Sequence, residues 1–218
     1  MTATKWILTA VFALLVAAPA PAAFITSLYG TGLNNDGTPR TNLQTELHYT
    51  LPVTPVVFDD VHGFPIGPWL NNASSATSRW ITPSAATNVP SGNYTYTTTF
   101  DLTGYVPGTA TITGRWAADN AGLNILLNGN SLGLTTTGGF SAFTSFSIPT
   151  GSGFVAGLNT LDFVVNNFDG PGNNPSGLRV ELTGNAGLVA TPVPPTALLA
   201  VFAFGTAGLG RLVRRRRA

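Results

Sequence analysis

Few side chains in this sequence could do acid, base or metal chemistry. It has nine acidic residues, two histidines and no cysteine. Asp59, Asp60 and His62 form a cluster with the spacing of metal ligands. The alternative is that these residues lie in a solvated loop between two strands. His48 falls in a predicted strand and is expected at the surface or half-buried. No HExxH, CxxC, P-loop or GxSxG pattern occurs, so we expect a protein that is not an enzyme.

Sugar binding is the chemistry that the remaining polar and aromatic residues favour. Aromatic faces pack against the C–H side of a sugar ring, while Asn, Asp and Arg side chains reach its hydroxyls. Trp69 follows a proline in an apparent loop and is expected to face a ligand, whereas Trp116 lies on the apolar face of a predicted strand and is expected in the core. Asp119-Asn120 has the alternative role of closing a turn. The candidate ligand-binding residues are Trp69, Arg79, Trp80, Arg115, Asp119 and Asn120.

The elements that must position these residues are predicted to be strands. Residues 94–100 and 110–116 alternate apolar and polar side chains with a period of two, which is typical of half-buried strands. Residues 123–127 end at Asn128-Gly129, a strong hairpin signal. Further strands are predicted at residues 46–54, 78–82, 140–148, 161–165 and 178–182. Turn signals recur between these runs, which favours an antiparallel β-sandwich or barrel.

The composition agrees with an all-β domain held together by its core. Charged residues make up 9% of the chain and cysteine is absent. Without disulfides, an exported domain depends on apolar burial, which a body of this length can supply. Prolines concentrate in the N-terminal third and keep it from forming a long central strand.

Four short segments of the sequence resemble the jelly-roll, galactose-binding-like modules of secreted bacterial proteins. They are Trp116–Asn120, Leu127–Gly129, Phe154–Leu161 and Gly177–Glu181. The resemblance covers roughly residues 94–184 and implies an antiparallel jelly-roll β-sandwich that binds glycans or serves as a non-catalytic module. It also implies a structural Ca²⁺ near the first loop and the last strand, for which Asn34, Asp36 and Glu181 are the candidate ligands.

The N-terminus has the pattern of a secretory signal peptide. Lys5 precedes an apolar run from Trp6 to Ala18, and Ala20-Pro21-Ala22 offers the small residues that signal peptidase accepts. We expect residues 1–22 to be removed and residues 23–184 to form the exported β-sandwich. A permanent anchor is the alternative, although the run is shorter than the roughly 20 residues of a bilayer span.

The C-terminus has the pattern of a membrane stop. A linker at residues 185–195 precedes an apolar segment at 196–213, and the tail at 214–218 is rich in arginine. At about 1.5 Å per residue, the segment would span about 27 Å as a helix, close to the bilayer core. A buried core helix or a disordered basic tail are the alternatives. The arginines that would resist translocation are Arg211, Arg214, Arg215, Arg216 and Arg217.

Charge is divided between the body and the tail. Residues 24–190 hold all nine acidic residues and four arginines, a net charge of −5, whereas the whole chain is +1. The arginine block adjoins an apolar segment and has no aromatic interleaving, so it does not indicate nucleic-acid binding. The positive-inside rule predicts a cytoplasmic tail and an exported body.

The same tail resembles the PEP-CTERM sorting signal of Gram-negative bacteria. That signal combines a proline-containing tetrad, a short apolar helix and a terminal arginine cluster. The tetrad here is Thr191-Pro192-Val193-Pro194, or Val193-Pro194-Pro195-Thr196 in the next register. The resemblance implies an exosortase, a membrane transpeptidase, as a processing partner in addition to signal peptidase.

Together these patterns predict a protein held transiently in the inner membrane and then sorted to the cell surface or matrix. Its predicted role is non-catalytic association with extracellular polysaccharide, with glycan binding through the jelly roll. The alternatives are a structural surface protein without a specific ligand and a glycan-active enzyme.

Overall fold

The structure is a computed structural model that describes residues 21–58, 67–74, 76–86, 88–168 and 174–190. Regular structure in this part of the chain is almost entirely β-strand, with one short 3₁₀ turn at Asn72–Ser74. The strands are β1 (Ala22–Phe24), β2 (Tyr49–Thr50), β3 (Val56–Phe58), β4 (Trp80–Thr82), β5 (Gly92–Asp101), β6 (Tyr105–Asp119), β7 (Ala121–Leu127), β8 (Asn130–Ser131), β9 (Thr144–Ile148), β10 (Leu158–Asn167) and β11 (Gly177–Leu188).

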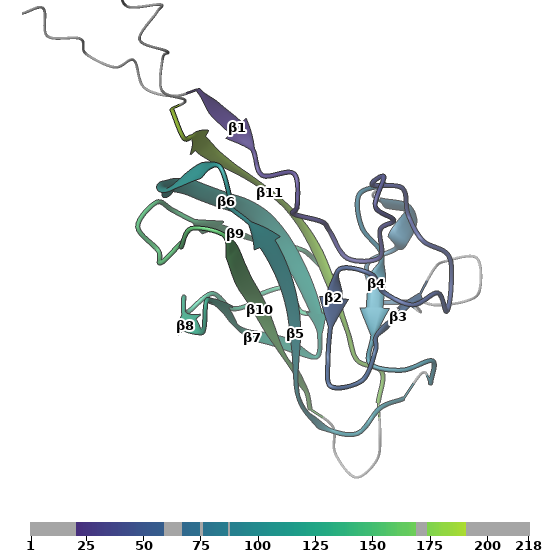
Figure 1. The fold of residues 1–218 in the computed structure, drawn as a ribbon. Coiled ribbons are helices and arrows are strands. Elements are labelled where there is room, and N and C mark those ends of the chain that lie inside the picture. The colour runs from purple at the N-terminus through teal and green to yellow at the C-terminus, as the bar shows by residue number, and fades with distance from the viewer. Residues whose placement is uncertain (1–20, 59–66, 75, 87, 169–173, 191–218) are drawn as a thin grey trace, which may run out of the picture. The chain divides into compact units, whose positions relative to one another are not determined.

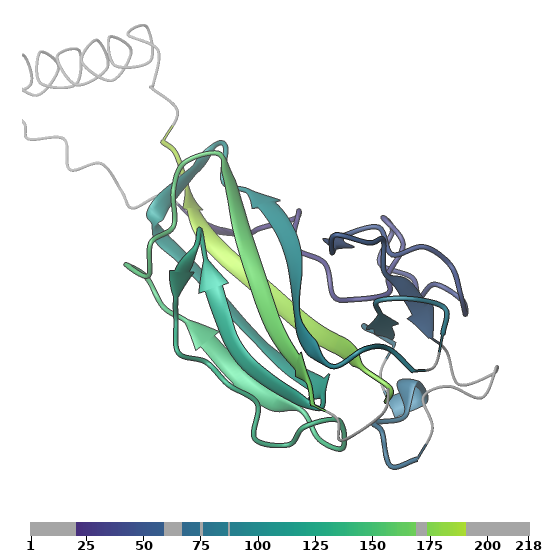
Figure 2. The ribbon, with the colours of Figure 1, turned by 90° about the horizontal axis from the view of Figure 1, so that it is seen from below.

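These strands form two antiparallel sheets that lie as two layers (Figures 1 and 2). The first sheet has the order β3-β4-β11-β6-β9, with β1 also paired to β11, and the second has the order β2-β5-β10-β7-β8. The last strand, β11, lies between β4 and β6, and the strand before it, β10, lies between β5 and β7. This connectivity is that of a jelly roll, so the prediction of an antiparallel jelly-roll β-sandwich is confirmed for the described residues.

The two inner faces supply the core. Along β6, Ala110, Ile112 and Trp116 are buried, as the period-two pattern predicts. The Trp116 ring lies 5.5 Å from that of Phe163 on β10, measured between centroids, which joins the two sheets. Burying aromatic side chains of this size supplies much of the apolar stabilisation of such a domain. The placement of Trp116 in the core is confirmed.

The β7–β8 hairpin also follows its sequence signal. Asn128 and Gly129 both have positive φ values, 51° and 79°. A two-residue turn with both residues in the left-handed region matches the twist of paired strands, and Asn-Gly adopts it readily.

Several predicted limits of strands and of the linker are wrong. Residues 46–54 pair only at Tyr49–Thr50, because Pro52 and Pro55 lack the N–H that a ladder needs. The strand predicted at 140–148 begins at Thr144, since residues 139–141 form a turn. At the other end, β11 continues to Leu188, so residues 185–188 extend the last strand instead of starting a linker.

Several predictions concern residues outside the described part of the chain. They are the signal-peptide residues up to position 20, the Asp59, Asp60 and His62 cluster, the sorting tetrad at 191–196, the apolar segment at 196–213 and the arginine tail. Within the residues that the structure describes, no helix is long and apolar enough to cross a membrane.

Candidate functional site

A groove of about 840 Å³ lies on the outer face of the first sheet. Its floor is formed by β6, β9 and β11, and its wall by the segment from Thr26 to Gly37 together with Thr77. We call it the outer groove. Its polar floor residues are Thr113, Arg115, Ser145, Glu181 and Thr183, and its polar wall residues are Thr26, Tyr29, Asn35, Asp36 and Thr77. The volume falls within the range of small-molecule sites.

The floor side chains come from three neighbouring strands. Ser145 on β9 pairs with Arg115 on β6, which pairs with Glu181 on β11, so the three residues form one cross-strand row. Thr113 and Thr183 are paired in the next outward-facing row. Residues two apart on a strand share a face, and strand pairing therefore gathers these side chains on one surface.

A network of charged side chains holds the floor in place. The Nε–H of Arg115 donates a 2.7 Å hydrogen bond to Glu181 Oε2, and Ser78 Oγ donates to Glu181 Oε1 at 2.8 Å. Arg179, which is fully buried, places its Nη2 4.0 Å from Glu181 Oε1. The guanidinium carbon atoms of Arg115 and Arg179 lie 4.4 and 5.1 Å from the centroid of the Phe143 ring. These contacts fix the direction of Arg115 across the floor.

The wall is tied to the edge of β11 by backbone hydrogen bonds. Thr31 N–H donates to the Val180 carbonyl at 3.0 Å, and the Val180 N–H returns a 3.0 Å bond to Thr31 Oγ1. At Gly32 the chain turns with a φ of 69°, and its N–H donates to Glu46 Oε2 at 2.8 Å. A side chain at this position would collide with Arg79, so the turn requires glycine.

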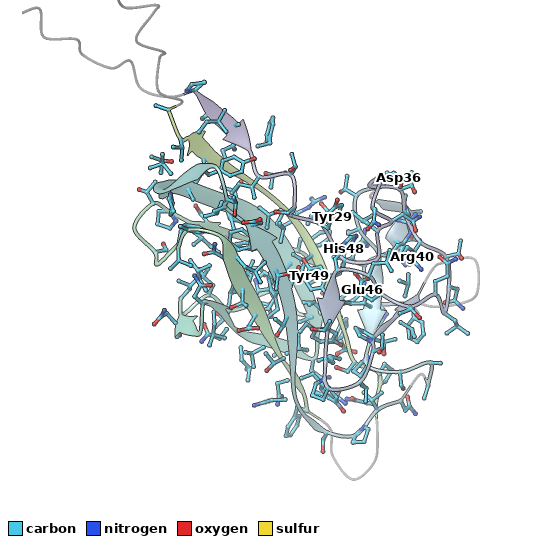
Figure 3. All side chains as sticks on the ribbon, viewed as in Figure 1. Tyr29, Asp36, Arg40, Glu46, His48 and Tyr49 are labelled. Atoms are coloured by element: carbon cyan, nitrogen blue, oxygen red, sulfur yellow. The ribbon has the colours of Figure 1, made fainter. Side chains whose placement is uncertain are left out.

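A polar cluster includes two wall residues and the side chains beside them. The side chains of Tyr29, Asp36, Arg40, Glu46, His48 and Tyr49 gather beside β2, β3 and β4 (Figure 3). The rings of Tyr29 and His48 stack with centroids 3.8 Å apart and planes within 3°. Tyr49 Oη donates to the Tyr29 carbonyl at 2.9 Å. The wall residue Tyr29 is therefore held through both its ring and its backbone.

The titratable members of this cluster are shifted by burial. Burial raises the pKa of Glu46, although hydrogen bonds from backbone N–H groups including that of His48 oppose the rise. Burial lowers the pKa of His48, and the positive charge of Arg40 lowers it further. Half-buried and close to a cation, the imidazole is favoured in its neutral form.

The lining is suited to a polyhydroxylated ligand. Four Thr and Ser hydroxyls from floor and wall can each donate and accept a hydrogen bond, and Arg115 donates while Asp36 accepts. They are Thr26, Thr113, Ser145 and Thr183. Both kinds of partner are needed, because each sugar hydroxyl is at once a donor and an acceptor.

The structure places the two tryptophans among the candidate binding residues in the interior. Trp69 is 8% exposed and Trp80 is fully buried, with their ring centroids 4.4 Å apart. With Phe58 and Ala117 they form a second apolar cluster on the outer side of the first sheet. The expectation that Trp69 projects from its loop is therefore wrong, because the loop folds back and buries the ring against Trp80 and Gly177.

The other predicted binding residues also have structural partners. The indole N–H of Trp69 donates a hydrogen bond to the Asp119 carboxylate, and Asp119 is 3% exposed. Asn120 Oδ1 accepts a 2.7 Å bond from the Phe168 N–H, 48 residues further along the chain, so it joins its turn to the end of β10 instead of closing the turn locally. Arg79 Nη1 donates to the carbonyls of Asn72 and Ser78. None of these residues lines the outer groove.

The pKa of Asp119 is raised to about 7, because burial outweighs the hydrogen bond with Trp69. Its Oδ1 has no hydrogen-bond partner among the described residues. An ionised carboxylate in that position would be poorly solvated, which makes Asp119 a source of pH dependence in stability.

The predicted calcium ligands do not form an open oxygen set. Asp36 and Glu181 do border the same groove. However, Asn34 Oδ1 accepts from Arg40, Asp36 Oδ1 accepts from Thr38, and both Glu181 oxygens accept from Arg115 and Ser78. A cation would have to displace these donors, so the residues do not fit calcium as they stand. In the described part of the chain, no three His, Cys, Asp or Glu side chains gather as a metal site.

Sequence reasoning missed most of the groove. No sequence motif includes the groove residues Tyr29, Asn35, Thr113, Ser145 and Thr183. Of the floor residues, only Arg115 was a candidate for sugar binding. The available signal was the strand period itself, which placed Thr113 and Arg115 opposite the buried Ile112 and Trp116.

Comparisons with known proteins are sparse. No family model and no curated protein matches the chain. One similar solved structure is the CBM36-1 domain of a multidomain xylanase from the hindgut metagenome of Trinervitermes trinervoides, with 19% identity and a TM-score of 0.29 over 47% of this chain and 76% of that chain. Another is the Podospora anserina GH26-CBM35 beta-(1,4)-mannanase, with 17% identity and a TM-score of 0.32 over 81% of this chain and 29% of that chain. Similarity at this level does not indicate what the present chain binds.

Proposed function

We propose that this protein is an exported, surface-sorted, non-catalytic protein that binds extracellular polysaccharide through the outer groove. The observation that carries the binding proposal is the row Ser145–Arg115–Glu181, with the Thr113–Thr183 pair beside it, at the floor of a groove of about 840 Å³. Such a surface matches sugar hydroxyls along a chain.

The groove also favours binding over hydrolysis. Glycosidases need one carboxyl group free to donate a proton and a second to act as base or nucleophile. The groove's two acidic residues are Asp36 and Glu181. Glu181 is occupied on both oxygens by Arg115 and Ser78, and the pKa of Asp36 is lowered by hydrogen bonds from Thr38. Asp36 therefore lacks the raised pKa of a general acid, and Glu181 has no oxygen free of a donor.

Sorting is proposed from the two ends of the chain. The signal-peptide pattern at 1–22 supports export with signal peptidase as partner, and the tail from Thr191 to Ala218 supports transient anchoring and processing by an exosortase-type enzyme. Mass spectrometry of the native protein would define both trimmed ends, and intact termini would contradict this part of the proposal.

A blocking variant tests the binding proposal. Thr113→Trp places an indole on the groove floor, while Thr99→Trp places the same side chain on the outer face of the second sheet. Both positions are exposed. In a glycan array and calorimetry with the full-length chain in detergent, we expect at least a tenfold loss of glycan affinity for Thr113→Trp only. Absence of saturable binding by the wild type would favour the structural alternative, and release of sugar from polysaccharide would favour the enzyme.

A further inference from the structure

The outer groove has an uneven distribution of charge. At its floor, Arg115 and Arg179 both lie near Glu181, with distances of 2.7 and 4.0 Å to its carboxylate. Two positive charges therefore meet one negative charge, and the floor keeps a positive surplus within a body whose residues 24–190 have a net charge of −5. On the wall, Asp36 contributes the opposite charge.

Arg115 is the part of the floor that a ligand can reach. Its side chain is 46% exposed, whereas Arg179 is fully buried. Among the described residues, Arg115 uses only Nε for a hydrogen bond, to Glu181. Its two Nη groups are left for a ligand, while the Glu181 bond and the Phe143 ring hold the guanidinium plane.

A fixed guanidinium with two available Nη groups suits one ligand group in particular. The planar fork of Arg matches the two oxygens of a carboxylate, and such charge-assisted pairs are stronger than hydrogen bonds to a neutral hydroxyl. Ser145 and Thr113 flank Arg115 with hydroxyls that can bind the hydroxyl groups of the same sugar.

The wall sets the orientation of such a ligand. Asp36 is exposed, and its Oδ1 accepts hydrogen bonds from the Thr38 N–H and hydroxyl. The negative charge of Asp36 repels a carboxylate, whereas its carboxylate oxygens accept hydrogen bonds from neutral hydroxyls. A sugar with a carboxylate on one side and hydroxyls on the other would therefore place the carboxylate at Arg115 and the hydroxyls towards Asp36.

We infer that the outer groove binds an acidic glycan, a polysaccharide containing uronic acid residues, with Arg115 as the residue that selects the carboxylate. This inference rests on the proposed glycan-binding function and adds the class of ligand. Binding of this kind weakens as salt screens the ion pair.

The test uses acidic glycans and their neutral counterparts. The probes are oligogalacturonate, alginate and hyaluronan oligosaccharides, each also in a form whose carboxyl groups have been reduced to primary alcohols. With the full-length chain in detergent, we expect at least one acidic probe to bind about tenfold or more tightly than its reduced form, and the preference to shrink at 0.5 M NaCl.

Matched variants then assign the preference to Arg115. Arg115→Gln should abolish it, and Arg115→Lys, which keeps the charge without the fork, should retain part of it. Thr99→Glu changes the net charge by the same amount on the other sheet and should keep the full preference; thermal unfolding checks that all variants fold. The inference is overturned if the reduced forms bind as tightly as the acidic forms or more tightly. It is also overturned if Arg115→Gln keeps the preference. In both cases the proposal of glycan binding still stands. Absence of binding to every acidic and neutral glycan overturns the proposed function itself.

Discussion

The Nε–H of Arg179 donates a 2.8 Å hydrogen bond to Ser78 Oγ across a separation of 101 residues. The same guanidinium donates from Nη1 to the Asn71 carbonyl at 2.9 Å. Because Ser78 also donates to Glu181, a floor residue of the groove, this contact joins the segment around Asn71 and Ser78 to the sheet below it. The buried arginine thus connects the stability of the fold to the shape of the site.

Replacing Arg179 should therefore be costly. Arg179→Met removes the donors to Asn71 and Ser78 and leaves buried acceptors without partners, so we expect a loss of about 3 kcal/mol or more in the free energy of unfolding. Denaturant unfolding of the full-length chain measures it. Arg115→Met, which breaks an exposed pair with the same Glu181, should cost about 1 kcal/mol or less. Equal losses in the two variants would contradict the structural role of Arg179.

Trp69 should contribute to stability and have no direct role in binding. Its ring is 8% exposed and packs on Trp80, so Trp69→Ala should cost about 3–5 kcal/mol. Thermal or denaturant unfolding gives the value. Phe168→Ala, at a side chain that is 72% exposed, is the control and should change stability by about 0.5 kcal/mol or less. A Trp69→Ala protein that unfolds like wild type would place the ring in solvent.

Asp119 should make the protein less stable as the pH rises from about 4 to about 7. Its pKa is about 7 in the fold against 3.8 for the ordinary group. In this range the unfolded chain releases a proton that the folded chain keeps, so the contribution is fully present below pH 3.8 and is lost as the pH rises. The free energy of unfolding should be measured at pH 4, 5.5 and 7.5 for wild type and Asp119→Asn. We expect the stability of the variant relative to wild type to increase with pH.

The control for this prediction is Asp101→Asn. Asp101 is exposed, and hydrogen bonds from Thr103 lower its pKa, so its contribution is lost as the pH falls. Asp101→Asn should therefore gain on wild type only as the pH falls below 3.8, and its stability should run nearly parallel to that of wild type between pH 4 and 7.5. A pH profile of Asp119→Asn parallel to that of wild type would show that Asp119 is not shifted in the fold.

His48 should make the groove wall sensitive to acid. Burial, with Arg40 adding to it, lowers the pKa of His48 below 6.5. Stability from this group is present above pH 6.5 and is lost as the pH falls towards the folded-state pKa. Tyr29 stacks on the imidazole and Glu46 Oε1 accepts from the His48 backbone N–H, while burial raises the pKa of both Glu46 and Tyr49.

The variant His48→Phe keeps a ring against Tyr29 and removes the titration. We expect its stability relative to wild type to be greater at pH 5 than at pH 7.5, and its glycan affinity to vary less between these pH values. Denaturant unfolding and calorimetry at the two pH values measure the differences. An equal stability difference at both would exclude His48 as the acid-sensitive group.

The arginine tail should retain the chain at the membrane. Changing Arg214, Arg215, Arg216 and Arg217 to Gln removes the cations that follow the apolar segment, and we expect more protein in the soluble fractions and altered processing. Cell fractionation and mass spectrometry of the mature form give the readout. If the variant is fractionated and trimmed as wild type, the stop-transfer hypothesis fails.

Local patterns predicted much of the sandwich. The alternation in β5 and β6 identified their inner faces, and Asn128-Gly129 identified a hairpin, because side-chain direction in a strand and φ preference in a tight turn are properties of neighbouring residues. Proline shows the limit of this reasoning: it excluded long strands from the N-terminal third but did not define the short pairings at Tyr49–Thr50 and Val56–Phe58.

The sequence by itself determined the all-β class, the core position of Trp116 and the strand face that carries Arg115. Only the tertiary structure decided that Ser145, Arg115 and Glu181 form one row, that residues 26–37 border it, and that Trp69 is buried. The physical reason is distance along the chain: strand order and the folding of a loop depend on partners such as Arg179 and Ser78, whose contacts no local pattern records.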